Sequence, residues 1–257
     1  MILLFRTLSI IFLSLSMINA QDIWEQPIII GASVSDGYEH TEKLGGPKSN
    51  ALALDHFLLK RINTPDIKFK NYSNRFTFIS PVIISSRQVA RAIKAKPSIV
   101  IAVDYLFWHL YGKFNSEEQR LKAFESALAK LDPVTSALVI GNIPDASHSI
   151  NKMLGASQVP ALKTIEQANI TLNAWADKRP QTTVINLKSF MAKSVSNKAL
   201  KLSLIEYPVG TTKNFLQSDM LHLTPSGVTA LSYAVLEAVQ RVSTLKDSQL
   251  NLPAKVQ

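Results

Sequence analysis

Short apolar runs alternate with amphipathic segments along most of this chain. Runs rich in β-branched residues and bounded by turn residues predict buried strands over 28–30, 98–103, 136–140 and 182–187. Apolar residues at helical spacing predict helices over 50–61, 86–94, 117–131, 162–177 and 228–242. Such alternation indicates right-handed crossovers and a mostly parallel sheet. We therefore predict an α/β protein, a three-layer α/β/α sandwich whose sheet has about five strands.

Two further short segments compete for the remaining strand. They span 67–69 and 75–79 and are separated by a polar Asn-Tyr-Ser-Asn turn. Because the alternation leaves room for one more strand, only one of them needs to join the sheet.

The first predicted strand leads into a tight turn that contains Ser33. The turn has the sequence Gly-Ala-Ser-Val-Ser-Asp-Gly over 31–37, and its small residues let the chain bend sharply at the carboxyl end of the strand. Ligands of open α/β sheets bind at that edge, so the Ser33 hydroxyl is a candidate nucleophile. An ordinary turn is the alternative, and Ser35 is a rival two positions away.

A second stretch, far along the chain, supplies the groups that a serine nucleophile needs. A serine hydroxyl becomes reactive when an imidazole takes its proton and a third group orients that imidazole. Asp219 precedes His222 by three residues, just before the last predicted helix. Together, the early serine turn and the late Asp-x-x-His loop favour a serine hydrolase.

These two stretches resemble the sequence blocks of the SGNH hydrolases, also called GDSL lipases or esterases. The turn over 31–37 resembles the nucleophile block, with Ala32 where an Asp is usual, and Asp-x-x-His followed by Leu-Thr-Pro-Ser-Gly resembles the final block. The resemblance implies a flavodoxin-like SGNH hydrolase fold. It also implies Ser33 as nucleophile, His222 as base and Asp219 as the partner of His222.

The middle blocks of that family, which supply oxyanion donors, depart from the pattern. No glycine occurs over 76–87, where a backbone N–H of Ser86 or its neighbour Ser85 is the substitute. The third block falls on 102–105 and places Asp104 where the family has an Asn. Either Asp104 is protonated and donates a hydrogen bond, or it points away and backbone amides, with Asn142, stabilise the oxyanion. We favour the second, so Asp104→Asn should keep activity within about tenfold of the parent or raise it.

Asn142 follows the strand over 136–140 and is the other candidate oxyanion donor, through its side-chain amide. A turn-forming role beside Gly141 and Pro144 is its alternative. The aromatic segment over 105–111 caps the core or forms an apolar wall for an acyl chain.

The first 20 residues predict a secretory signal peptide. They contain one charged residue, Arg6, an apolar run over 8–17 and a small residue at Ala20. The run is short for a bilayer span, so we expect cleavage after Ala20 and a secreted or periplasmic protein; a retained anchor is the alternative. The hydrolase-like domain is then expected over 21–246, with a disordered tail over 247–257.

The amino-acid composition limits the classes of partner and cofactor that the protein is expected to have. The chain of 257 residues has no cysteine, which excludes disulfides and thiolate chemistry, and its formal net charge of +9 favours an anionic membrane or wall polymer as surroundings. Its basic residues are scattered singly, so we expect no nucleic acid. A triad mechanism requires no metal and no cofactor.

The sequence therefore predicts an exported serine ester hydrolase, an esterase or lipase that acts on a small-molecule, lipid or glycan ester. A carbohydrate O-acetylesterase acting on envelope polysaccharide is one alternative. A catalytically weak binding module that keeps the fold is another, because two of the oxyanion elements depart from the family pattern.

Overall fold

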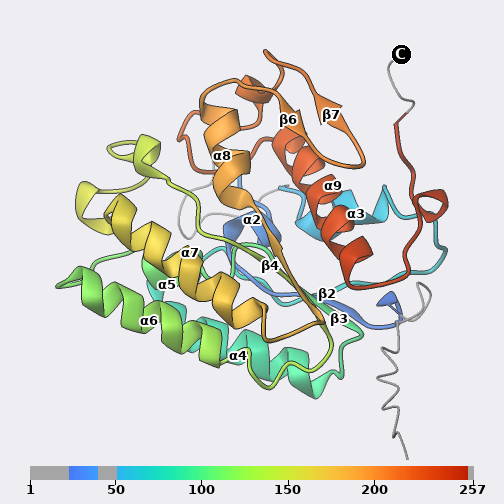
Figure 1. Cartoon of the computed structure of the whole chain (residues 1–257), viewed down its shortest axis with the longest axis horizontal. Coiled ribbons are helices and arrows are strands. Elements are labelled where there is room, and N and C mark those ends of the chain that lie inside the picture. The colour runs from blue at the N-terminus through green and yellow to red at the C-terminus, as the bar shows by residue number, and fades with distance from the viewer. Residues whose placement is uncertain (1–22, 40–50, 254–257) are drawn as a thin grey trace, which may run out of the picture.

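A five-stranded parallel sheet forms the centre of the molecule (Figure 1). A computed structural model describes residues 23–39 and 51–253. The strands stand in the order β2-β1-β3-β4-β5, and every pairing in this sheet is parallel. Their bounds are Pro27–Ile29 for β1, Lys70–Asn71 for β2, Ile99–Ala102 for β3, Ala137–Gly141 for β4 and Thr182–Ile185 for β5. The predicted fold class, a parallel α/β sandwich of about five strands, is confirmed.

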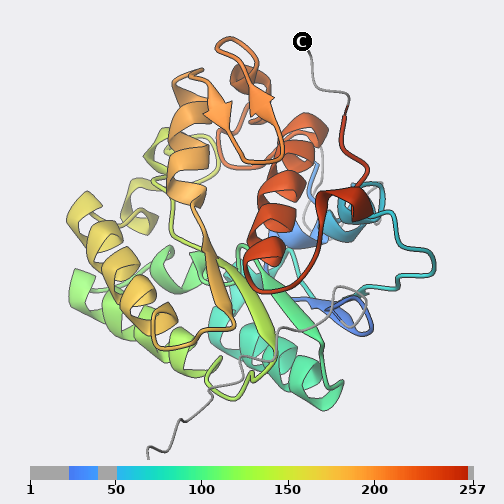
Figure 2. The ribbon, with the colours of Figure 1, turned by 45° about the vertical axis from the view of Figure 1, so that its right-hand side comes forward.

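Helices cover both faces of the sheet, as Figure 2 shows with α9 on one side of the strands and α6 and α7 on the other. One layer contains α3 (Leu54–Leu59), α8 (Leu187–Val195) and α9 (Pro225–Arg241). The other contains α4 (Pro81–Lys94), α5 (Phe107–Leu110), α6 (Glu117–Ala129) and α7 (Leu162–Ala176). Within the described residues, none of these helices has the length and apolarity needed to cross a bilayer.

Strand periodicity divides the core between the two layers. Ile29 packs with α3 and α9, whereas its neighbours Ile28 and Ile30 pack with α4 and α6. All three are fully buried. Successive side chains of a strand point to opposite faces, and a central parallel strand is covered on both, which is why this run is apolar without alternation.

The edge strand lies between the two predicted segments. β2 is Lys70–Asn71, so 67–69 precedes it, and the other segment contains a 3₁₀ turn, η1, over Thr77–Ile79. The backbone turns here: the Phe76 oxygen accepts the Ile79 N–H at 3.0 Å, and the Asn74 oxygen accepts the N–H (3.0 Å) and hydroxyl (2.6 Å) of Thr77. The prediction of a strand over 75–79 was therefore wrong.

The end of the described chain is ordered, contrary to our expectation for 247–257. A 3₁₀ turn, η5, spans Asp247–Gln249, and Leu250 after it is buried and pairs with Ile62 in an isolated bridge. The N–H of Asn63 also donates to the oxygen of Gln249 at 2.7 Å. The folded unit thus extends past 246. Residues 254–257 and the predicted signal peptide over 1–20 lie outside the described residues.

Buried His109 on α5 should make the fold sensitive to mild acid. Its Nε2 lies 3.0 Å from Ser85 Oγ, and burial, together with the charge of Lys130, lowers its pKa to about 4. The unfolded chain binds this proton near pH 6.5, so stability is lost as the pH falls from about 6.5 towards 4. Between pH 7 and pH 5 the loss is about 2 kcal/mol.

Urea unfolding at the two pH values measures this loss. A His109→Gln variant should lose about 2 kcal/mol less than the parent over the same interval. His148→Gln is the matched control, because His148 is exposed. The same loss in parent and His109→Gln would contradict the assignment.

Candidate active site

The turn after β1 presents Ser33 at the carboxyl edge of the sheet. The chain passes through Gly31, whose φ of 150° favours glycine, and then forms α2 over Ser33–Asp36. A Cβ atom on Gly31 would lie 2.2 Å from an Asp104 oxygen. Glycine is therefore required here, because the approach of the two segments leaves no room for a side chain.

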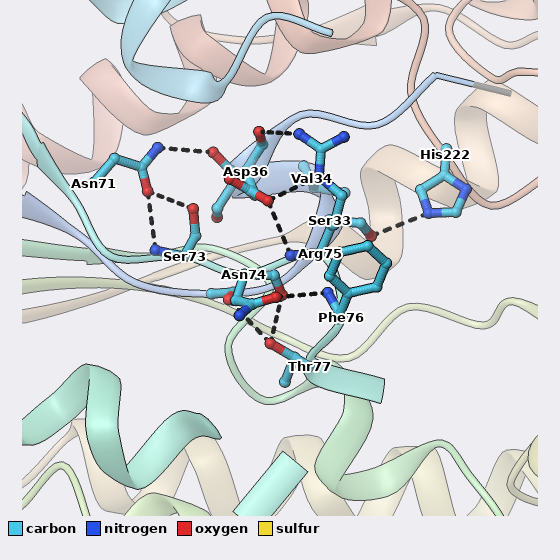
Figure 3. Close-up of polar contacts among 12 residues, drawn as sticks. Ser33, Val34, Asp36, Asn71, Ser73, Asn74, Arg75, Phe76, Thr77 and His222 are labelled. Carbon is cyan, nitrogen blue, oxygen red and sulfur yellow. Dashed lines mark hydrogen bonds and ion pairs between the residues drawn. The ribbon is translucent and has the colours of Figure 1, made fainter. Parts of the chain in front are cut away.

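Ser33, His222 and Asp219 form a continuous chain of hydrogen bonds. Ser33 Oγ lies 3.0 Å from His222 Nε2, as Figure 3 shows, and His222 Nδ1 lies 2.6 Å from Asp219 Oδ2. The three residues are 8%, 3% and 5% exposed. The structure thus brings together the three residues that sequence analysis singled out, in the order hydroxyl, imidazole and carboxylate.

Asp219 is held by its own loop. Its Oδ1 accepts the backbone N–H groups of Leu221 and His222, both at 2.9 Å, and Met220 between them has a positive φ of 59°. Burial alone would raise the pKa of Asp219, but the hydrogen bond and charge of His222, with the two backbone donors, outweigh it and lower the pKa below 3.8. Asp219 is therefore ionised at neutral pH and can orient an imidazolium.

Tyr38 is the site residue that sequence analysis missed. Its ring stacks on the imidazole of His222, with centroids 3.8 Å apart and 20° between the planes. The stack restricts the rotation of the imidazole, and an aromatic face attracts a protonated ring. No spacing signal links two residues so far apart in the chain, so only the fold reveals this contact.

Asp104 holds the turn over 31–37 that contains Ser33, referred to below as the nucleophile turn. Its Oδ1 accepts the N–H of Ala32 at 2.9 Å and the hydroxyl of Ser35 at 2.6 Å, and its Oδ2 accepts the N–H of Val34 at 2.8 Å. Both carboxyl oxygens are therefore engaged by the turn itself, and Asp104 acts on its backbone and on Ser35.

Asp104→Asn should consequently lower both activity and stability, against our expectation from sequence. Either orientation of the amide places an NH₂ group against a donor of the turn. The free energy of unfolding should fall by about 1.5–3 kcal/mol, and kcat should fall roughly tenfold to a hundredfold because the turn positions Ser33.

Urea unfolding and ester hydrolysis would measure the two effects. Asp145→Asn is the matched control, since Asp145 accepts one backbone bond, from Ser147, in a neighbouring loop. An Asp104→Asn variant with parental stability and parental kcat would overturn the role given to Asp104.

Asp36 and Arg75 tie the loop after β2 to this turn (Figure 3). Asp36 Oδ2 accepts Arg75 Nε at 2.9 Å and the Arg75 backbone N–H at 3.0 Å. Burial raises the pKa of Asp36, although the Arg75 contacts oppose the shift. The nucleophile turn is therefore held by Arg75, from the loop after β2, and by Asp104, from the loop after β3.

Ser86 lies away from the site. It is exposed on α4, where its hydroxyl donates to the backbone oxygen of Val82 at 2.6 Å. Ser85 is also inside this helix, so their backbone N–H groups belong to the helical ladder and cannot serve an oxyanion. The helix begins at Pro81, earlier than the predicted 86, and this displacement is why the proposed donors were misplaced.

Asn142 borders the site and also anchors the next helix. It lines the cavity beside Ser33, while its Oδ1 accepts the N–H of Lys188 at 2.8 Å and its Nδ2 donates to Asn186 Oδ1 at 3.2 Å. One Nδ2 proton remains for a ligand. The Ser33 backbone N–H, at the start of α2, has no acceptor among the described residues.

An apolar cavity of about 60 Å³ opens beside Ser33. Its walls include Phe107, Trp108, Ile143, Leu187, Phe190 and Met191. Part of the aromatic segment over 105–111 thus forms a wall of the cavity, while Tyr105 and Tyr111 are buried in the core. A second, larger hollow of about 270 Å³ lies on the Tyr38 side of His222.

No group of three or more potential metal ligands occurs among residues 23–39 and 51–253. The candidate site consists of a hydroxyl, an imidazole, a carboxylate and the Ser33 backbone N–H at the mouth of an apolar cavity. That set of groups can perform acyl transfer.

Comparison with solved structures identifies the fold. A lipase/acylhydrolase from Enterococcus faecalis has a TM-score of 0.55 at 14% identity, over 89% of this chain and 98% of that one. TesA has a TM-score of 0.52 at 16% identity, over 85% and 99%. A variant of an acetyl xylan esterase from Geobacillus stearothermophilus has a TM-score of 0.53 at 14% identity, over 90% and 99%.

The structure therefore has the fold of the SGNH hydrolases. The resemblance seen in the sequence is confirmed for the fold. Many of the similar structures are GDSL/SGNH lipases or acylhydrolases. No protein-family model matches the sequence, and no curated protein matches it.

Proposed function

We propose that this protein is a carboxylic ester hydrolase with Ser33 as its nucleophile. The observation that carries the proposal is the unbroken chain from Ser33 Oγ through His222 to Asp219, with links of 3.0 and 2.6 Å, at the mouth of an apolar cavity. Its fold, shared with esterases and acylhydrolases, supports the same reaction class.

Each step of the reaction has a group to perform it. Ser33 Oγ attacks the ester carbonyl while His222 Nε2 takes the hydroxyl proton, and His222 then gives that proton to the departing alkoxide. Water, activated by His222, releases the acyl group from Ser33. The Ser33 backbone N–H is the oxyanion donor that the geometry favours, with the remaining Nδ2 proton of Asn142 as a second.

The cavity sizes favour a short acyl group. A cavity needs about 10–15 Å³ to hold one water-sized group, so the apolar cavity accepts roughly four to six such groups. The larger hollow has polar groups from Tyr38, Glu39, Gln217 and Thr224 and suits a bulkier alcohol part. A small acyl pocket beside a larger hollow that carries some polar groups also suits the second candidate, a carbohydrate O-acetylesterase.

A series of p-nitrophenyl esters tests this proposal. Activity should be highest for acetyl to butyryl esters and should fall steeply for longer chains, because the cavity is short. A fluorophosphonate probe should label the parent protein and not a Ser33→Ala variant. Absence of labelling in the folded parent would favour a binding module that keeps the fold without catalysis.

Export remains part of the proposal. We propose cleavage after Ala20 and release to the periplasm or the medium, where the basic chain would meet anionic lipid or wall polymer. Amino-terminal sequencing of the exported protein should begin at Gln21. A mature protein that retains Met1 would contradict cleavage.

A further inference from the structure

Exposed apolar side chains gather on one short segment of the surface. The apolar patch consists of Phe76, Phe78, Ile79, Val82 and Ile83, which are 38% to 62% exposed. Twelve large apolar residues are exposed in the described part of the chain, and five of them lie within the eight consecutive positions 76–83. Such concentration marks an interaction surface, whereas single exposed apolar residues are ordinary.

The apolar patch adjoins the candidate active site. It begins directly after the loop in which the Asn74 N–H donates to the Gly31 oxygen of the nucleophile turn at 3.0 Å. Phe78 also contacts Trp108, with ring centroids 5.7 Å apart, and Trp108 is part of the cavity wall. A partner seated on the patch would therefore lie beside the cavity.

The helix that begins within the patch is basic. α4 carries Arg87, Arg91 and Lys94, all exposed, and has no acidic residue. The Lys130 side chain also reaches the patch, where its amine donates to the Val82 oxygen at 3.2 Å. An occupant must therefore offer apolar volume and negative charge together. An anionic lipid surface supplies both, and an amphipathic basic helix is the element that binds such a surface.

We propose that the apolar patch and the basic positions of α4 dock this protein on an anionic lipid bilayer. The patch side chains enter the boundary between headgroups and acyl chains, and Arg87, Arg91 and Lys94 contact anionic headgroups. This docking goes beyond the proposed hydrolysis and does not require it.

Cosedimentation of the exported protein, residues 21–257, with lipid vesicles tests the docking. We expect binding to vesicles of equal parts phosphatidylcholine and phosphatidylglycerol, weaker binding to phosphatidylcholine alone, and loss of binding as salt is raised. The double variant Ile79→Gln/Ile83→Gln should bind at least about tenfold more weakly, because two apolar anchors are removed. Arg87→Gln/Lys94→Gln should bind more weakly and with less dependence on salt.

The matched control is Leu162→Gln/Ile170→Gln. Both of its residues are 61% exposed on α7, compared with 62% for Ile79 and 53% for Ile83. It should bind like the parent. The docking would be overturned if the patch variant and the control variant bound equally weakly. It would also be overturned if the parent did not bind anionic vesicles. A dimer of the parent that the patch variant converts to a monomer would likewise overturn it, since the occupant would then be a second copy.

Hydrolysis of soluble p-nitrophenyl acetate separates the two proposals. The patch, charge and control variants should all hydrolyse it at the parental rate, because none of their residues lines the cavity. Hydrolysis without vesicle binding would overturn the docking alone. Vesicle binding without hydrolysis would overturn the proposed function alone.

Discussion

Replacing Ser33 with Ala should lower kcat by a factor of about 10⁴ to 10⁶, which is the range for loss of a serine nucleophile from a triad. The fold should survive this change, because the Ser33 hydroxyl makes one hydrogen bond, to His222, at the edge of the cavity. Steady-state hydrolysis of p-nitrophenyl acetate and urea unfolding of the same preparation would measure both quantities.

Ser35→Ala is the matched control for this experiment. It is the same chemical change two positions away, in the same turn, and Ser35 is fully buried. Its hydroxyl donates to Asp104 Oδ1 at 2.6 Å and does not contact His222. We expect a lower stability and a kcat within about tenfold of the parent. Equal losses of kcat in the two variants would contradict the choice of Ser33.

Asp219→Asn should lower kcat by about 10⁴. Asp219 Oδ2 fixes the imidazole through Nδ1 and favours the tautomer whose Nε2 can accept the Ser33 proton. An Asn amide in this place can donate to Nδ1 and favour the opposite tautomer. The cost is in kcat more than in KM, because the orientation and charge of His222 matter most in the transition state.

A carboxylate outside the site controls for the general effect of this substitution. Asp132 accepts Trp175 Nε1 at 2.9 Å and Arg179 at 3.3 Å and does not line the cavity, so Asp132→Asn should retain the parental kcat. A folded Asp219→Asn protein with kcat within tenfold of the parent would show that His222 is oriented by other groups.

The elements predicted well from sequence are those specified by local pattern. The β1 run is apolar because both faces of a central strand are buried. The helix predicted over 228–242 is α9, although it begins three residues earlier, at Pro225, where Thr224 caps the N–H of Gly227. Asp219 and His222 are also local to each other, being three residues apart, so their contact at 2.6 Å needs only one loop.

The features that sequence analysis missed depend on contacts between distant segments. Nothing near Asp104 indicates that its carboxyl would meet the turn over 32–35, since that contact requires β3 to lie beside β1. The stack of Tyr38 on His222 is hidden for the same reason. The start of α4 was readable, by contrast, because Pro at the first helical position is a start signal.

Two amides of the nucleophile turn should exchange hydrogen with solvent at very different rates. The slower one, at Gly31, is held by Gln88. The Gln88 side chain accepts from the Gly31 N–H at 3.1 Å and donates to the Gly31 oxygen at 2.8 Å, as a neighbouring strand would. Exchange at Gly31 therefore requires separation of α4 from the sheet and should be as slow as in the core strands. Ser33, two residues on, has an N–H without an acceptor in the described chain and borders the cavity, so its amide should exchange rapidly. Within a single turn, the amide of Ser33 should therefore exchange with solvent rapidly, while the amide of Gly31, which supports it, should exchange slowly.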